Sequence, residues 1–189
     1  MNKYLLLLLL CISSSVTYAN EEDWYAYWAI GMVNHDYPGG LNSFLNDTES
    51  LPGVDRTEIG LDVFGFYKPQ SKNNLSGFVF SGSADQFESR HSELQINQYL
   101  LGISGMEFFG RGIGDGFFIR GDAGLAWITV SDNSSTTETS DIGFGYLLGV
   151  GYAIPVSDES RILISVNFSD KRVEDNSWKS ATVMLGGLW

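Results

Sequence analysis

The stretch 141–154, DIGFGYLLGVGYAI, constrains the fold of this chain more than any other. Every second residue from Ile142 to Ile154 is apolar or aromatic, and the residues between them are four glycines, a leucine and an alanine. This period of two predicts a β-strand. A strand of a soluble sheet carries polar residues opposite its apolar face. Small residues opposite a broad apolar face are instead typical of a barrel strand that turns its apolar side to lipid.

Seven other segments show a related alternation, so the sequence predicts an all-β protein. We expect an eight-stranded antiparallel up-and-down transmembrane β-barrel, because an even number of strands lets the first and last pair and close the sheet. Closure matters because each unpaired backbone group in hydrocarbon costs several kcal/mol. The predicted strands are 24–34, 56–67, 75–83, 94–108, 117–130, 141–154, 160–169 and 178–189.

The connections between these strands alternate in length. The segments 35–55, 84–93, 131–140 and 170–177 are predicted polar loops, whereas the other turns are short. Outer-membrane barrels have short periplasmic turns and longer outer loops. We therefore expect the longer loops outside the cell and both chain ends in the periplasm.

Two expectations concern which way individual side chains face. Trp24, Ala26, Trp28, Ile30 and Met32 are expected outward on the first strand, and Ile59, Leu61, Val63, Gly65 and Tyr67 are expected to share one face of the second. Five aromatic residues near strand ends are candidates for the interfacial girdles of such barrels. They are Tyr25, Tyr27, Trp127, Tyr152 and Trp189.

The first nineteen residues form a predicted signal peptide. Lys3 precedes an apolar run, and small residues end at Ala19, where cleavage is expected. The run is too short to span a membrane, which takes about 20 apolar residues. Cleavage removes the single cysteine, Cys11. The predicted domains are therefore a signal peptide over 1–19 and an outer-membrane barrel over 20–189.

Two stretches, 117–132 and 141–168, resemble the penultimate hairpins of porin-family outer-membrane β-barrel proteins, the small eight-stranded group of Gram-negative bacteria. The terminal residues LGGLW resemble the signal that the barrel assembly machinery reads, with Leu185 and Trp189 as its residues. Gly187 departs from that pattern, which usually has an apolar residue there. The resemblance implies location in the cell outer membrane, contact with lipid and lipopolysaccharide, and the assembly machinery as a partner. It does not imply one function, since the group includes adhesins, pores and enzymes.

Four charged residues are predicted to face the barrel lumen, because lipid does not tolerate charge on the outer wall. They are Glu58, Asp62, Arg120 and Asp122. The favoured interpretation is a salt-bridge network that plugs the barrel, since a paired buried charge is tolerated and a lone one is costly. The alternative is a narrow polar path for ions or small solutes.

His91, Ser92 and Glu93 form the one segment that suggests catalysis. It resembles the histidine–serine neighbourhood of outer-membrane lipid A deacylases, although those enzymes separate the two residues by one position. Adjacent side chains of a strand point to opposite faces, and the segment is predicted to be a loop. We therefore expect no catalytic site here. The alternative is a catalytic site formed by these three residues.

The remaining features favour a non-enzymatic role. The net charge of −12 argues against a nucleic-acid partner. No metal or cofactor is expected, since His35 beside Asp36 is a lone histidine. We expect a role in surface interaction or envelope maintenance, with an extracellular ligand bound by the outer loops. The alternatives are a porin-like channel and an enzyme that modifies lipid A or phospholipid.

Overall fold

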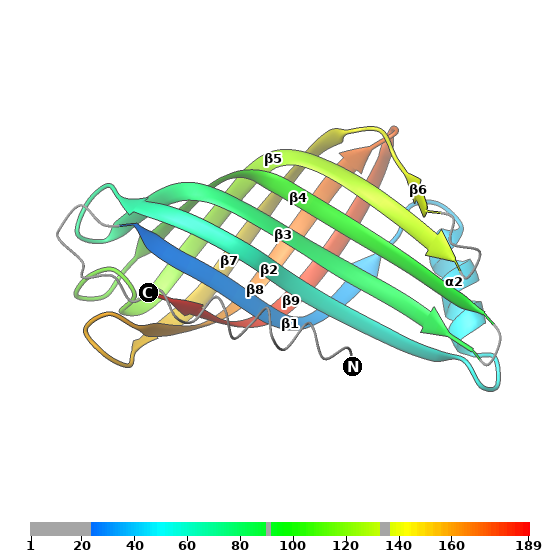
Figure 1. Ribbon diagram of the computed structural model, residues 1–189, viewed down its shortest axis with the longest axis horizontal. Coiled ribbons are helices and arrows are strands. Elements are labelled where there is room, and N and C mark those ends of the chain that lie inside the picture. The colour runs from blue at the N-terminus through cyan, green and yellow to red at the C-terminus, as the bar shows by residue number, and fades with distance from the viewer. Residues whose placement is uncertain (1–23, 90–91, 133–136) are drawn as a thin grey trace.

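The computed structural model describes residues 24–89, 92–132 and 137–189. Most of these residues form strands, and one short helix follows the first strand (Figure 1). The elements are β1 Tyr25–Asp36, α2 Leu41–Glu49, β2 Asp55–Pro69, β3 Asn74–Glu88, β4 Glu93–Phe108, β5 Gly116–Asp132, β6 Thr137–Thr139, β7 Gly143–Pro155, β8 Arg161–Val173 and β9 Asn176–Leu188.

The strands close into a barrel. Each long strand pairs with its sequence neighbours, all pairs are antiparallel, and β9 returns to pair with β1. The seam continues past β9, where Trp189 and Ala26 exchange backbone hydrogen bonds of 2.7 and 3.1 Å. The short strand β6 extends the edge of β5 beyond the end of β7. The predicted eight-stranded antiparallel barrel is confirmed.

An apolar belt surrounds the outer wall. In β7, Phe144, Leu148 and Val150 are exposed, whereas Leu147 and Ala153 are buried in the interior, so the alternation faces as predicted. Large apolar side chains pointing outward match a barrel whose wall meets lipid. The exposed apolar residues of the belt include Met32, Phe78, Ile103, Leu125, Leu148, Val166 and Leu185.

Side chains fill the barrel interior, as expected for eight strands. The glycines of β7 provide room for larger neighbours: a Cβ at Gly151 would lie 2.5 Å from the Phe118 ring, and one at Gly145 would lie 3.0 Å from Leu100. The buried apolar residues form two clusters, one toward each end of the barrel. Tyr67, Phe108, Phe118 and Leu163 belong to the cluster near the chain terminus, and Tyr37, Leu45, Phe87 and Ile128 to the one near α2.

Several strands extend further than predicted. Residues 84–88 belong to β3 and 170–173 to β8, so the loops predicted over 84–93 and 170–177 are much shorter. β8 and β9 are joined through Glu174 and Asp175, whose φ values of 51° and 62° suit a two-residue hairpin turn. The extensions rise beyond the belt at the α2 end of the barrel. We call this region the collar; its outward side chains are polar, as where Gln95 donates to Asn97 and Asn97 to Thr129.

The predicted loop 35–55 contains the helix α2. Leu41 and Leu45 lie four residues apart and so share one helix face, and Leu45 is 1% exposed. The segment is too short for a clear helical period, which is why the sequence reads as a polar loop. Among the described residues, no helix is long and apolar enough to cross a membrane.

A β-bulge changes the facing of β2. The register with β3 shifts between Asp62 and Phe64, which leaves Val63 as an extra residue. Phe64 is therefore exposed, and Tyr67 is buried inside the barrel rather than sharing the face of Ile59. The prediction was therefore wrong for Gly65 and Tyr67, which both face inward, because one inserted residue moves every later side chain to the opposite face.

Two of the predicted girdle residues lie on the inner side of β1. Tyr25 is half-buried and packs against the interior cluster near the chain terminus. Tyr27 is buried in the lumen, whereas Trp28 beside it faces outward and meets Trp189 edge to face, with ring centroids 6.4 Å apart. The first strand otherwise faces as expected, with Ile30 and Met32 exposed.

Candidate functional site

One buried polar group in the lumen is centred on Arg120 of β5. Its guanidinium forms ion pairs with Asp62 and Asp122, and it donates a 3.0 Å hydrogen bond to the Tyr27 hydroxyl. Tyr27 in turn donates to Asp62 at 2.9 Å. We call these residues, with Ser104, which donates to Asp122, the Arg120 cluster. It binds strands from opposite sides of the barrel together.

A second polar group lies near the α2 end and is centred on Arg56. The guanidinium makes two hydrogen bonds to Asp85, of 2.9 and 2.8 Å, and one of 3.0 Å to Glu58. It also pairs with Glu49 of α2 at 3.0 Å. Tyr37 donates to Asp85 at 2.6 Å, and we call these five residues the Arg56 cluster. The cluster ties the helix to the barrel wall.

The structure therefore divides the four predicted lumen residues. Asp62, Arg120 and Asp122 are in contact, whereas Glu58 belongs to the Arg56 cluster. Glu58 and Asp62 share a strand face but lie four residues apart, which is about 13 Å along a strand. That separation explains why one arginine does not serve both carboxylates.

A third group, missed by the sequence analysis, involves Lys171 of β8. Its ammonium is buried and donates to Gln98 at 3.2 Å and to Ser169 at 3.0 Å. Gln98 also meets a ring nitrogen of His35 at 3.0 Å. Lys171 falls in the segment predicted as a charged loop. The signal that could have placed it is the alternation of β8, which continues through Ser169 and Lys171 on the inward face.

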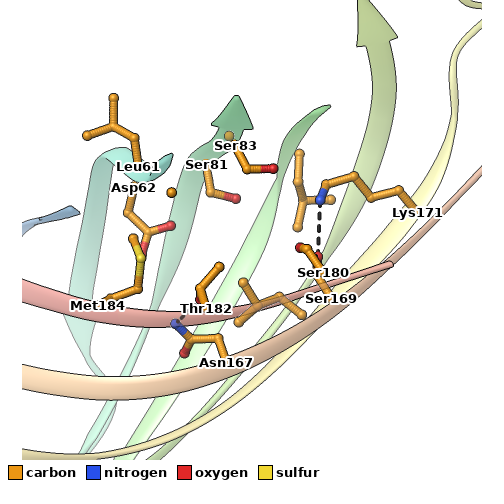
Figure 2. A pocket seen from close by; sticks show the side chains of 14 residues that line it. Leu61, Asp62, Ser81, Ser83, Asn167, Ser169, Lys171, Ser180, Thr182 and Met184 are labelled. Atoms are coloured by element: carbon orange, nitrogen blue, oxygen red, sulfur yellow. Dashed lines mark hydrogen bonds between the residues drawn. The ribbon is translucent and has the colours of Figure 1, made fainter. Parts of the chain in front are cut away.

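A small cavity separates the Arg120 and Arg56 clusters. Gly60, which lies between Glu58 and Asp62 in the sequence of β2, lines the cavity. Lys171 reaches into it from β8 (Figure 2). The cavity offers about 30 Å³ to the centres of water molecules. One water needs roughly 10–15 Å³ on this measure. The space suits a few waters and is too small for an organic ligand.

Two polar atoms of the cavity wall lack a hydrogen-bond partner within the described part of the chain, Ser83 Oγ and Asn167 Oδ1. Figure 2 shows Ser83 and Asn167 on different walls of the cavity, with Asn167 donating to Thr182 at 3.1 Å. Buried polar atoms of this kind are commonly satisfied by internal water. The lumen is thus a series of polar groups interrupted by a small cavity that is large enough for water.

The helix α2 covers the lumen at the collar end. Leu45 packs into the apolar cluster that includes Phe87, Ile128 and Val173, which come from three different strands. Asn42, one turn before Leu45, donates to Asp36 at 2.7 Å and accepts from the Tyr37 backbone at 3.0 Å. The helix is therefore attached by apolar, ionic and hydrogen-bonded contacts. Its placement at the mouth limits access to the lumen from this end.

The segment considered for catalysis lies at the hairpin between β3 and β4. His91 lies outside the described residues. Ser92 is exposed and closes the turn, with its carbonyl accepting from the Ser89 backbone at 2.8 Å. Glu93 is exposed at the start of β4 and accepts from Gln86 at 2.8 Å. The described contacts of Ser92 and Glu93 are those of a hairpin turn.

The two residues of the predicted assembly signal lie on the outer wall or at its edge. Leu185 is exposed within the apolar belt. Trp189 follows β9, and its ring meets Trp28 across the seam. Both are accessible from the lipid-facing side of the last strand.

No protein-family model matches this chain, and the comparison with curated proteins gave no match. Solved structures do match. Ail of Yersinia pestis, determined with the heparin analogue sucrose octasulfate, aligns at a TM-score of 0.50 and 10% identity over 88% of this chain and 99% of Ail. The fold is that of a small outer-membrane β-barrel.

Two further solved barrels align with lower scores. Neisserial surface protein A gives a TM-score of 0.48 and 13% identity, covering 87% of this chain and 95% of its own. OprG of Pseudomonas aeruginosa gives 0.44 and 12%, covering 89% and 96%. At such identities the likeness concerns architecture alone.

Proposed function

We propose that this chain is an exported outer-membrane barrel that acts without catalysis, in surface interaction or envelope maintenance, through its α2 end. The observation that carries the proposal is the contrast between wall and lumen. The wall presents an apolar belt next to a polar collar, whereas the lumen is filled by the Arg120 and Arg56 clusters. Such a barrel offers its outer end, rather than a passage, to other molecules.

The belt supports contact with outer-membrane lipid and lipopolysaccharide, and the collar supports an orientation with α2 outside the cell. Export would use the predicted signal peptide over 1–19. Insertion would use the barrel assembly machinery, reading the last strand through Leu185 and Trp189. The connection 37–54 would then face the exterior, together with the β3–β4 and β8–β9 turns at the same end. The turns that join β2 to β3, β4 to β5 and β7 to β8 would face the periplasm.

The charge of the α2 end favours a particular ligand chemistry. Ail binds a sulfated heparin analogue. In this chain the helix and its flanks carry Asp47, Glu49 and Asp55, and the whole protein has a net charge of −12. A polyanion would be repelled here, so we expect a neutral or cationic ligand.

Fractionation and heating test the proposal together. The protein should appear in outer-membrane fractions and migrate as a faster band in unheated detergent gels than after boiling. A protease specific for glutamate, added to intact cells, should cut within 37–54 if α2 lies outside. Planar-bilayer recordings should show no sustained conductance. Recovery in the soluble periplasmic fraction, or cleavage only after the outer membrane is permeabilised, would contradict the proposal.

A further inference from the structure

Two large apolar side chains are exposed at the α2 end, outside the lipid-facing belt. Phe44 is 59% exposed and Leu51 is 56% exposed. The helix that carries Phe44 sits among the strand tips, because Leu45 packs against Phe87 and Val173 there. Lipid covers the apolar side chains of the belt, but it does not explain why Phe44 and Leu51 are apolar and exposed.

Phe44 and Leu51 lie on one side of the helical segment. They are seven residues apart, close to two helical turns, which places them about 10 Å apart along the same face. The winding continues beyond Glu49, since the Leu51 backbone N–H donates to the Thr48 carbonyl at 3.1 Å. The inner face is formed by Leu41 and Leu45, so this second apolar face has no partner within the described residues.

Exposed acidic residues lie close to this face in the sequence. Asp47 lies between Phe44 and Leu51 in sequence and is exposed, and Asp55 follows at the start of β2. The guanidinium of Arg56 is shared by Glu49, Glu58 and Asp85, so the Arg56 cluster keeps a negative charge. An apolar pair set in an acidic rim is complementary to an apolar surface with a basic border.

We infer that the face formed by Phe44 and Leu51 docks a cationic amphipathic segment of a partner protein or peptide. Apolar side chains of that segment would cover Phe44 and Leu51, while its lysines or arginines would meet Asp47 and Asp55. A second copy of this chain fits less well, because both copies carry the same acidic face. This inference rests on the proposed exposure of α2 at the cell surface.

Peptide binding tests the inference with the full barrel in phosphatidylcholine nanodiscs. The probe is a labelled synthetic helix with leucines on one face and lysines on the other, followed by fluorescence anisotropy, with binding to empty nanodiscs subtracted. Two comparison peptides replace all lysines by glutamate or all leucines by serine. The Leu/Lys peptide should bind, and both comparison peptides should bind at least about tenfold more weakly.

Variants of the barrel distinguish specific binding at the Phe44 and Leu51 face from non-specific binding of the peptide. The double variant Phe44→Ser and Leu51→Ser should weaken binding about tenfold or more, since it removes the apolar contact. Asp47→Lys should weaken binding and reduce its salt dependence. The matched control, Phe109→Ser with Val156→Ser, removes two similarly exposed side chains at the other end and should leave affinity unchanged. All variants should keep heat-modifiable migration.

The outcomes separate this inference from the proposed function. Equal affinity for wild type and the Phe44/Leu51 double variant, or equal binding of the glutamate peptide, would overturn the docking site. So would light scattering that shows dimers in wild type and monomers in the double variant, because a second copy would then be the occupant. If glutamate-specific cleavage on intact cells succeeds while the peptide fails to bind, the surface location stands and the docking inference alone is lost.

Discussion

Arg120 of β5 and Asp62 of β2 form an ion pair across the lumen, although β3 and β4 lie between their strands in the sheet. The pair therefore links walls of the barrel that share no backbone hydrogen bonds. Both side chains are buried. Taking such charges out of water is costly, so each depends on its partner for compensation.

Replacing Arg120 should destabilise the barrel strongly. Arg120→Leu leaves Asp62 and Asp122 buried without their guanidinium, and removing one partner of a buried pair typically costs about 3–5 kcal/mol. Urea unfolding of the barrel in lipid vesicles, followed by tryptophan fluorescence, measures the loss. The control Arg172→Leu removes an arginine side chain that is 74% exposed. Its effect should stay below about 1 kcal/mol, and equal unfolding midpoints for the two variants would contradict the role of Arg120.

Shortening Leu45 should release α2 from the barrel mouth. Removing a buried leucine side chain typically costs about 2–5 kcal/mol, and the loss here falls on local attachment of the helix. Cleavage after Glu49 by a glutamate-specific protease should accelerate about tenfold or more in Leu45→Ala. Phe44→Ala, on the exposed side of the same helix, should change the rate little. An unchanged rate in Leu45→Ala would show that the Glu49–Arg56 ion pair suffices to hold the helix.

The Tyr37 hydroxyl should keep its proton in alkaline solution. Burial, followed by its hydrogen bond to Asp85, raises the pKa of Tyr37 well above its ordinary value. The unfolded chain loses this proton near pH 10. The stabilisation is thus fully present below about pH 10 and is lost as the pH rises above it.

Absorbance at the tyrosinate band checks this expectation. Between about pH 10 and 11, folded wild type and folded Tyr37→Phe should show the same number of tyrosinates. After unfolding in urea, wild type should show more tyrosinate than the variant, and the difference should approach one group at about pH 11. A difference already present between the folded proteins in this range would mean that Tyr37 ionises normally.

The belt was predictable because lipid imposes one rule on every strand that crosses it. Ile142, Leu148 and Val150 must be apolar wherever they face hydrocarbon, so period-two alternation alone identifies the wall. The expectation of a charged lumen follows from the same rule, and in the structure Arg120 contacts Asp62 and Asp122 inside the barrel. Both inferences depend on a uniform environment outside the barrel.

The rule fails where that environment changes or where the backbone departs from regularity. Beyond the belt the strands continue in a polar setting, so Lys171 and Asp85 read as loop residues although they face the lumen. The bulge at Val63 has no signal in the amino-acid composition of β2. The inward position of Tyr67, which results from the bulge, could therefore not be predicted. The strand extensions and the bulge both depend on pairing between strands that are distant in the sequence. The alternation within a single strand carries no information about that pairing.

Changing the last residue should affect assembly in the cell more than stability. Trp189→Ala retains the backbone hydrogen bonds to Ala26 and loses one edge-to-face contact with Trp28, worth about 0.5–1.5 kcal/mol beyond its buried area. If the assembly machinery reads this residue, outer-membrane yield in cells should fall several-fold while refolding of the purified variant into detergent proceeds as in wild type. The control Trp24→Ala removes an exposed tryptophan before β1 and should leave both quantities unchanged. If the outer-membrane yield and the refolding yield fell by the same factor, the role of Trp189 would be in barrel stability instead, because the seam between β1 and β9 would then be weakened.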